Sequence, residues 1–185
     1  RLVYREPSVG QDKGIVVLSG GLDSTTSAQI ACMKHQSVVL AHFHYGCRAE
    51  ERETQAVKEI YKHLKDAFPE KDIRLEFFDL SFIKNLGGNA LTDHSMEVAT
   101  GEAGAEFAHE WVPFRNGVMV SLIAAYCDRY KIGSIYTGAN LEEAGAYGDN
   151  EEEFYIHFNK VLQIGNNARP VIVNPLDKMM KHEIV

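Results

Sequence analysis

The feature that constrains this chain most is a short apolar run followed at once by a glycine-rich turn. Residues 15–25 read Ile-Val-Val-Leu-Ser-Gly-Gly-Leu-Asp-Ser-Thr. The four apolar residues predict a strand that is buried on both faces. Gly20 and Gly21 permit unusual dihedral angles and let backbone N–H groups approach an anion without an intervening Cβ. Residues 23–25 are expected to cap and open the next helix, whose positive N-terminus favours an anion. The string therefore predicts a phosphate site, and an ordinary glycine-rich turn is the alternative.

The residues of this turn also narrow the kind of phosphate chemistry. A Walker-type loop places a lysine directly before its serine or threonine, and residues 19–25 contain no lysine. The Gly-x-Gly-x-x-Gly pattern of dinucleotide sites is absent from the string as well. The string instead resembles the PP-loop of the ATP pyrophosphatase superfamily. Members of that superfamily cleave ATP between the α- and β-phosphates and adenylate a substrate.

Length and composition predict one enzyme domain with a sizeable core. The chain has 185 residues, of which 45% are hydrophobic and 24% charged, which is ordinary for a globular protein. It contains no run of about 18 apolar residues and opens on no signal-peptide pattern, so we expect no membrane partner.

Cysteine spacing and net charge indicate the cellular compartment and the kind of binding partner. Cys32, Cys47 and Cys127 lie far apart, with neither metal-ligand spacing nor the framework of a secreted protein, so we expect a reducing cytoplasm. The net charge of −7 disfavours a large surface for nucleic acid, although a local basic pocket for a small anion remains compatible with it.

Strand and helix patterns alternate along the chain. Strands are predicted at 15–18, 37–43, 73–78, 134–137 and 171–173, and helices at 24–35, 49–65, 116–130, 149–164 and from 178 onwards. The helix at 116–130 is almost continuously apolar, which predicts that it is buried. This order predicts an α/β fold with a doubly wound, mainly parallel five-stranded sheet that is Rossmann-like and binds ligands at the carboxyl ends of its strands.

The same pattern predicts an N-terminal extension at 1–14 and one nucleotide-binding domain at 15–185. Within this domain the segment 81–112 contains several glycines and shows little periodicity. Because loops of that length in a small domain usually have a function, we predict a substrate loop or lid there.

Polar residues follow the second predicted strand, where such a fold places its site. Arg48 offers a planar fork of donors for a phosphate or a carboxylate. The alternative is an arginine at a helix start, paired with Glu51 or Glu53. Tyr45, after His44, is predicted to lie against adenine, and a plain loop aromatic is equally compatible with the sequence.

Two later clusters are also candidates. Arg115 and Asn116 stand before the predicted buried helix, either as part of a substrate-closing element or with Asn116 as a simple helix cap. After the fourth strand, Gly138 and Asn140 precede an acidic stretch at 142–153. Most of those carboxylates are expected on a solvated face or as charges at a helix start, and one or two of them are candidates to hold Mg²⁺ or to position an amine.

Several motifs together resemble one family, the 7-cyano-7-deazaguanine synthases of queuosine biosynthesis. The similar segments are 19–26, 45–48, 112–116, 137–140, positions within 154–165, 175–176 and 181–185. The resemblance covers 15–185 and implies an adenine nucleotide alpha hydrolase-like fold. The first segment identifies the superfamily, and the later segments select the family.

The chain departs from the family pattern at three places. Phe114 stands where the family usually has Gly, and the stretch 142–150 differs from the usual Asp-Tyr-Ser-Gly-Tyr-Pro-Asp-Cys. Family members carry a zinc-binding cluster of four cysteines shortly beyond the position of Val185, so zinc ligands are expected after that residue and none within this chain.

The resemblance implies an ATP-dependent C–N ligase that converts 7-carboxy-7-deazaguanine and ammonia to 7-cyano-7-deazaguanine through adenylation of the carboxylate. It implies ATP and Mg²⁺ as cofactors, Zn²⁺ in the full-length protein, and a cytoplasmic homodimer that binds no nucleic acid. Three alternatives stay open: an enzyme that stops at the deazaguanine amide, a PP-loop enzyme for another substrate such as tRNA, and a non-catalytic nucleotide-binding module.

The predicted site residues fall into three groups. The catalytic residues are Ser19, Asp23, Ser24 and Arg115. The nucleotide-binding residues are Leu18, Ser19, Gly20, Gly21, Leu22, Asp23, Ser24, Thr25, His44, Tyr45, Arg48 and Gly138. The substrate-binding residues are Arg115, Asn116, Asn140, Glu143 and Lys181.

Overall fold

The backbone of the computed structural model is built on five parallel strands in the order β3-β2-β1-β4-β5. The structure describes residues 10, 12–44, 50–86, 114–138, 148–176, 178–179 and 181–184. The strands are β1 (Lys13–Val17), β2 (Ser37–His44), β3 (Asp72–Asp79), β4 (Ser134–Tyr136) and β5 (Val171–Val173). The sheet confirms the predicted α/β fold: the chain winds outward from β1 to β3 and then returns to the other side of β1 for β4 and β5.

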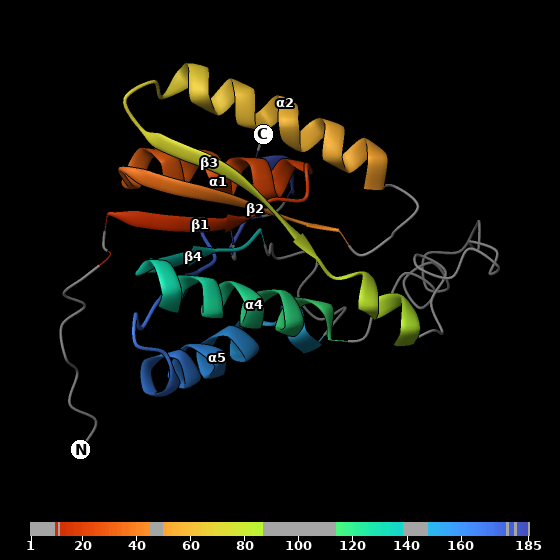
Figure 1. Cartoon of the computed structure of the whole chain (residues 1–185), viewed down its shortest axis with the longest axis vertical. Helices are drawn as coiled ribbons and strands as arrows, with labels where there is room; N and C mark the ends of the chain where they lie inside the picture. The colour runs from red at the N-terminus through yellow and green to blue at the C-terminus, as the bar shows by residue number, and fades with distance from the viewer. Residues whose placement is uncertain are drawn as a thin grey trace.

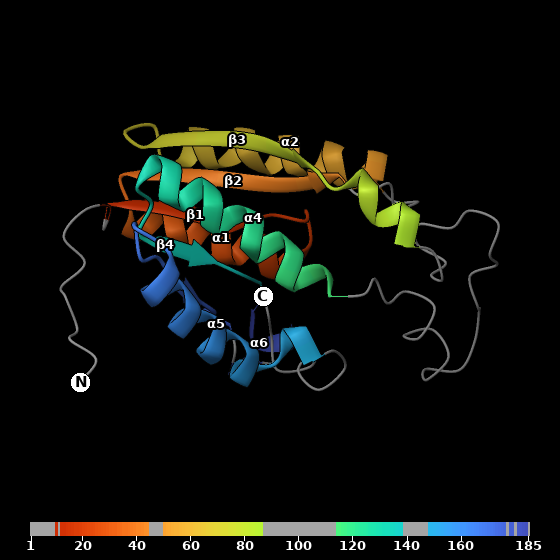
Figure 2. The same ribbon diagram turned by 60° about the horizontal axis from the view of Figure 1, so that its bottom comes forward.

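Helices cover both faces of this sheet. They are α1 (Leu22–Lys34), α2 (Glu50–Ala67), α4 (Arg115–Tyr130), α5 (Glu152–Gly165) and the short α6 (Lys181–Ile184), with 3-10 turns η1 (Ser81–Leu86) and η2 (Gly148–Asn150). Figures 1 and 2 show α1 and α2 on one face and α4 and α5 on the other. Because the strands are parallel, all their carboxyl ends meet at one edge of this sandwich.

The central strand β1 is buried on both faces, as its sequence predicts. Ile15 and Val16 have no exposed surface. Ile15 packs in the core that contains Ile123 of α4, whereas Val16 packs in the core that contains Ala28 of α1. Successive side chains of a strand point to opposite faces, so a continuous apolar run fills both cores.

The first helix begins earlier than the sequence predicts. The pattern placed its start at residue 24, with residues 23–25 as caps, but α1 begins at Leu22 and its N-cap is Gly21, which makes no side-chain cap hydrogen bond. The glycines complete the chain reversal within two residues of Ser19, so Asp23 already lies in the first helical turn. The prediction of side-chain capping by these residues is therefore wrong.

The predicted burial of the 116–130 helix is only half right. Met119, Ile123 and Cys127 of α4 are buried against the sheet, but Leu122 and Tyr130 are exposed. The helix packs on the sheet through one face alone, and apolar residues on its other face meet solvent. Likewise the helix predicted at 149–164 starts as the 3-10 turn η2 and becomes α-helical only at Glu152.

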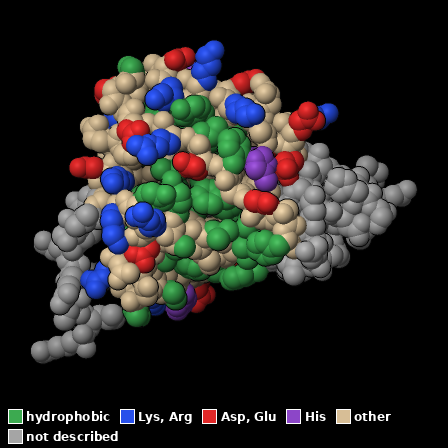
Figure 3. Space-filling view, viewed as in Figure 1, with side chains coloured by type: hydrophobic (Ala, Val, Ile, Leu, Met, Phe, Trp, Pro, Cys, Tyr) green, Lys and Arg blue, Asp and Glu red, His purple; other side chains and the backbone are tan. Residues whose placement is uncertain are grey.

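Figure 3 shows the surface on the side of β3 and α4. Lys, Arg, Asp and Glu side chains are interspersed over α2, while apolar side chains gather lower down, over β3 and α4. The large apolar residues of these two elements that are exposed are Phe77, Leu122 and Tyr130. This face therefore carries both signs of charge and an apolar band. Among the described helices, none has the length and apolar character needed to cross a membrane.

Candidate nucleotide site

The glycine-rich turn after β1 has the backbone that the sequence anticipates. Gly20 has φ +92°, a conformation that residues with a Cβ rarely adopt. A Cβ on Gly20 would also lie 3.1 Å from the Cβ of Ala56 and 3.4 Å from the carbonyl oxygen of Glu53, both on α2. Both the turn conformation and the close approach of α2 thus require glycine at this position.

The serine hydroxyls of the turn form a small network. Ser19 Oγ lies 3.1 Å from Ser24 Oγ, and Ser24 Oγ accepts from the backbone N–H of Ser19 at 3.2 Å. Ser24 Oγ lies 3.1 Å from the carbonyl oxygen of Gly21, and Thr25 Oγ1 donates to the same carbonyl at 2.7 Å. The predicted residues Ser19, Gly21, Ser24 and Thr25 therefore come together around the N-terminus of α1.

The end of β4 closes against this turn. A Cβ on Gly138 would lie only 3.0 Å from the backbone nitrogen of Ser24. The two strands concerned, β1 and β4, flank the point at which the strand order reverses, and doubly wound sheets bind ligands in the crevice at that point. The structure thus brings Gly138, which lies 114 positions after Ser24 in the sequence, to the glycine-rich turn.

Hydrogen bonds hold the end of β4 in this place. The carbonyl oxygen of Thr137 accepts from the buried hydroxyl of Ser27 on α1 at 3.1 Å. The Thr137 hydroxyl bonds to the side-chain oxygen of Asn174, just after β5. Neither Ser27 nor Asn174 was among the predicted site residues, and no local pattern in the sequence pairs them with Thr137.

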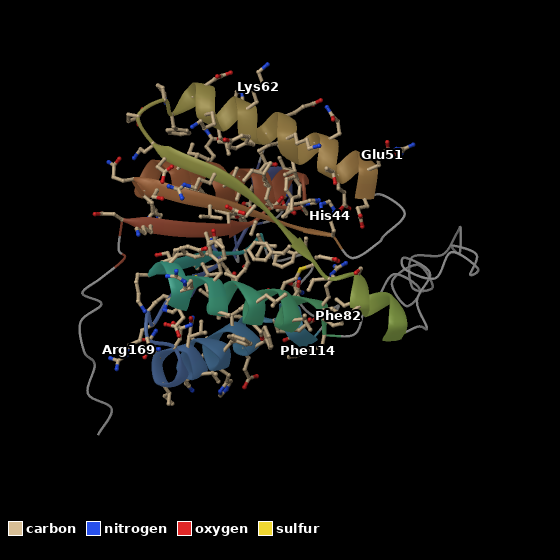
Figure 4. All side chains as sticks on the ribbon, in the orientation of Figure 1. His44, Glu51, Lys62, Phe82, Phe114 and Arg169 are labelled. Carbon is tan, nitrogen blue, oxygen red and sulfur yellow. The ribbon has the colours of Figure 1, made fainter. Side chains whose placement is uncertain are left out.

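His44, a predicted nucleotide-binding residue, ends β2. Its ring stacks on Phe77 of β3, with centroids 5.1 Å apart and planes 12° apart. Its Nδ1 lies 3.3 Å from a carboxylate oxygen of Glu50, the first residue of α2. Figure 4 places His44 at the end of the molecule where the strands finish. His44 is therefore at the expected edge of the sheet, with its ring already engaged by protein groups.

Arg115 and Asn116 open α4, and the cap of this helix comes from elsewhere. The backbone N–H of Asn116 donates to Asp149 Oδ2 at 2.8 Å. The N-cap position is Phe114, and no side-chain cap hydrogen bond comes from it. The simple alternative in which Asn116 itself caps the helix is thus wrong. Asp149 belongs to the acidic stretch that the sequence places mostly on a solvated face or at helix starts, and it is buried in this role.

Phe114 adopts a left-handed conformation, with φ 51° and ψ 32°. Its ring packs so closely on Gly117 that a Cβ there would lie 2.3 Å from the ring. It also makes an edge-to-face contact with Phe154 of α5 at 5.9 Å. Left-handed backbone costs an L-residue about 1–2 kcal/mol, which explains why glycine is the easier choice at this position. Phe114 remains 54% exposed, at the edge where the strands end (Figure 4).

One buried residue beneath the glycine-rich turn is not among the site residues predicted from the sequence. His42 of β2 is only 1% exposed, and its Nδ1 lies 2.9 Å from the carbonyl oxygen of Leu18. Burial lowers the pKa of His42, against the opposing effect of the Leu18 carbonyl. The available signal was a histidine that shares the inward face of the strand with Val38 and Leu40.

The other predicted residues are less informative. Tyr45, Arg48, Asn140 and Glu143 lie outside the described residues, as does most of the predicted lid, 87–112. Of the remaining residues, Leu22 is the exposed first residue of α1, and Lys181 is the first residue of α6.

The residues present can be tested for a divalent cation. Within the described residues, no group of three or more His, Cys, Asp or Glu side chains could hold a metal by itself. Mg²⁺ in nucleotide sites is commonly held by one or two carboxylates together with phosphate oxygens. Asp23 in the first turn of α1 is the carboxylate that fits such a shared site. A nucleotide-borne Mg²⁺ is therefore compatible with this turn, whereas a site made by protein alone is not found there.

Fold and site first define a class. A doubly wound parallel sheet with a Ser-Gly-Gly-x-Asp-Ser turn at its switch point is the architecture of the PP-loop ATP pyrophosphatases. A solved 4-thiouridine synthetase in complex with RNA and ATP shares this fold, with a TM-score of 0.60 and 15% identity over 94% of this chain and 39% of that one. Residues 13–185 match the family described as queuosine biosynthesis protein QueC, and the chain belongs to that family.

Two curated relatives of the chain share the name 7-cyano-7-deazaguanine synthase. A 7-cyano-7-deazaguanine synthase from Sulfolobus acidocaldarius is 41% identical over 92% of this chain and 37% of its own length. A 7-cyano-7-deazaguanine synthase from Campylobacter concisus is 37% identical over 94% of this chain and 76% of its own length. The chain thus spans little more than a third of the Sulfolobus protein.

Proposed function

We propose that this chain performs the ATP-dependent conversion of 7-carboxy-7-deazaguanine and ammonia to 7-cyano-7-deazaguanine. The observation that carries the proposal is the family match over residues 13–185, which includes the serine and glycine turn around the N-terminus of α1. The relatives named 7-cyano-7-deazaguanine synthase support the product, and the substrate is what the family resemblance implies.

The chemistry needs an activated carboxylate. A carboxylate is a poor electrophile, so its oxygen attacks the α-phosphorus of ATP and pyrophosphate leaves, which gives an acyl-adenylate. Ammonia then attacks the acyl carbon and AMP leaves, which gives the amide. The amide oxygen then attacks the α-phosphorus of a second ATP and pyrophosphate leaves. Loss of AMP, which carries away that oxygen, and of the two amide protons leaves the nitrile.

The turn after β1 supports the first of these steps. The N–H groups of the first turn of a helix have no partner within the helix, so those of α1 suit the pyrophosphate. Ser19 and Ser24, which bond to each other in this structure, are proposed to donate to phosphate instead when ATP binds. Removing one preorganised donor of this kind typically costs about 10²–10³-fold in rate. Asp23 is proposed to share Mg²⁺ with the phosphates.

The remaining predicted residues enter as proposals of the same kind. Arg115, at the start of α4, is proposed to pair with the carboxylate or the α-phosphate, since its planar fork suits both. Asn116, Asn140, Glu143 and Lys181 are proposed for the substrate. Leu18, Leu22, Thr25, His44, Tyr45, Arg48 and Gly138 are proposed for the nucleotide. Closure of 81–112 would protect the acyl-adenylate from water.

The proposal extends to assembly and zinc. We propose a cytoplasmic homodimer without a nucleic-acid partner, which light scattering of the purified native protein and cell fractionation test. A four-cysteine zinc site, implied by the family resemblance, is proposed to follow the segment 181–185. Elemental analysis of the native protein tests for it.

The activity is tested with native protein, ATP, ammonium and 7-carboxy-7-deazaguanine. We expect AMP and pyrophosphate only when the carboxylate is present, and a nitrile product by mass spectrometry. Ser24→Ala should lower the rate by about 10²-fold or more. Ser121→Ala removes a hydroxyl that donates to the Gly117 carbonyl within α4 and serves as the matched control. Full activity of a double variant that also carries Asp23→Ala would refute the proposal.

A second candidate keeps the adenylation but changes the acceptor chemistry. The observation that favours it is the left-handed Phe114, an aromatic ring where the family usually has glycine. An amide product, or turnover with a different carboxylate, would support this candidate. Tight ATP binding without turnover of any carboxylate would instead indicate a non-catalytic module.

A further inference from the structure

We propose that His42 is a positioning residue for the phosphate turn and that it acts through the carbonyl group of Leu18. The inference rests on the proposed function, because it assigns this role for ATP binding at the same site. Leu18 directly precedes Ser19, the first residue of the turn. A contact that holds the peptide group between Leu18 and Ser19 therefore also fixes the direction in which the turn leaves the sheet.

Both backbone polar groups of Leu18 are held by β2. Its N–H donates to the carbonyl of Ala41 at 2.9 Å, which is a sheet hydrogen bond one residue beyond the end of β1. Its carbonyl oxygen lies 2.9 Å from Nδ1 of His42, the next residue of β2. The imidazole therefore reinforces the attachment of Leu18 to β2 at the point where the chain turns away.

The hydrogen bond fixes the tautomer of His42. A carbonyl oxygen only accepts, so Nδ1 must carry the proton and donate it. Nε2 is buried and has no hydrogen-bond partner among the described residues. Burial lowers the pKa of the ring, so the neutral form with a bare Nε2 is favoured. The rings of His44 and Phe77 make edge-to-face contacts with it at 5.1 and 5.8 Å.

An unpaired acceptor makes histidine a poor choice if the position serves packing alone. Neighbours on the same face, Val38 and Leu40, are apolar, and an apolar residue at 42 would leave no buried nitrogen unsatisfied. Residues that break such a local rule are expected at functional sites. The group that offsets this disadvantage is Nδ1, through its bond to Leu18.

Two substitutions separate the nitrogens of the ring. The amide of His42→Asn occupies the place of Nδ1 and can still donate to the Leu18 carbonyl, whereas the amide of His42→Gln occupies the place of Nε2. With the native full-length protein, we expect His42→Asn to keep the KM for ATP within about threefold of wild type. We expect His42→Gln to raise it about tenfold, with the KM for 7-carboxy-7-deazaguanine unchanged.

Thermal unfolding of the same variants provides the structural control. The inference requires that His42→Gln and His42→Asn unfold at similar temperatures although they differ in KM for ATP. Equal KM values, or a loss of ATP affinity that only follows a loss of stability, would overturn it, and so would a failure of His42→Gln to fold. If wild type itself forms neither AMP nor pyrophosphate, the proposed function fails instead.

Discussion

The carboxylate of Asp149 accepts a hydrogen bond from the backbone N–H of Asn116 at 2.8 Å, across 33 residues of sequence. It satisfies one of the N–H groups that the first turn of α4 cannot pair internally. A negative charge at this end also suits the helix dipole. The segment after β4 thus supports the start of the helix that presents Arg115.

Removal of this cap should destabilise the protein. Asp149→Ala is expected to lower the free energy of unfolding by about 1 kcal/mol, and Asp149→Asn, which keeps an acceptor, by less. Urea titration followed by circular dichroism measures both. Glu153→Ala is the control, since this glutamate is exposed and its ion pair with His157 lies at the surface. Equal stability of Asp149→Ala and wild type would contradict the capping role.

Gly138 should tolerate no side chain if the turn binds ATP as proposed. In Gly138→Ala the new methyl group would meet the backbone nitrogen of Ser24 at 3.0 Å, so the helix start must shift. We expect ATP affinity to fall about tenfold or more in calorimetric titration. Gly165→Ala, where nothing lies within 4 Å of the added carbon, should bind ATP like wild type. If Gly138→Ala bound ATP as tightly as wild type, the end of β4 would not be part of the ATP site.

The left-handed backbone at Phe114 predicts a difference between two truncations. Phe114→Ala keeps a Cβ at φ 51°, and Phe114→Gly does not. The glycine variant should therefore be the more stable of the two by about 1 kcal/mol. Ala125→Gly, at an exposed position within α4, is the control. There the change from alanine to glycine should lower the free energy of unfolding by about 1 kcal/mol, because glycine weakens a helix. Chemical denaturation compares all three.

The buried imidazole of His42 predicts a loss of stability in acid. Burial lowers its pKa from 6.5 in the folded protein, with a smaller contribution of the same sign from His44 and opposing effects of the Leu18 carbonyl and Glu50. The unfolded chain therefore takes up a proton at higher pH than the folded one. The contribution of His42 is complete above pH 6.5 and is lost as the pH falls below it. Over that window the slope is at most about 1.4 kcal/mol per pH unit.

The comparison of wild type with His42→Asn isolates this effect from that of the other histidines. The difference in unfolding free energy between the two proteins should change between pH 7 and pH 5, and stay constant above pH 7. A constant difference across the whole range would mean that His42 titrates alike in folded and unfolded chains.

Cys32 and Cys127 should be unreactive in the folded protein. Burial raises the pKa of Cys32 to about 11 and that of Cys127 to about 12. Because the thiolate is the nucleophile, iodoacetamide at pH 8 should label neither residue until urea unfolds the chain. Peptide mapping by mass spectrometry assigns the label to each cysteine. Rapid labelling of Cys127 in native buffer would show that α4 opens locally.

Sequence reasoning predicted the elements of the fold better than their ends. The apolar run at 15–18 and the alternation of strand and helix led to the correct parallel sheet, since burial of a strand on both faces leaves a continuous local pattern. The start of α1 was placed two residues late, because Asp23 and Ser24 resemble cap residues while the true N-cap is Gly21. The burial of α4 was overestimated, because the sequence does not distinguish an exposed apolar residue such as Leu122 from a buried one.

The sequence by itself determined the glycine-rich turn, because the dihedral freedom of Gly20 and the hydroxyls of Ser19 and Ser24 act over a few residues. The tertiary structure decided which distant residues meet this turn. Gly138 and His42 reach it, and Asp149 reaches the start of α4, only because the parallel register aligns the carboxyl ends of the strands at one edge. Those contacts depend on strand order and helix packing, and local patterns in the sequence determine neither of them.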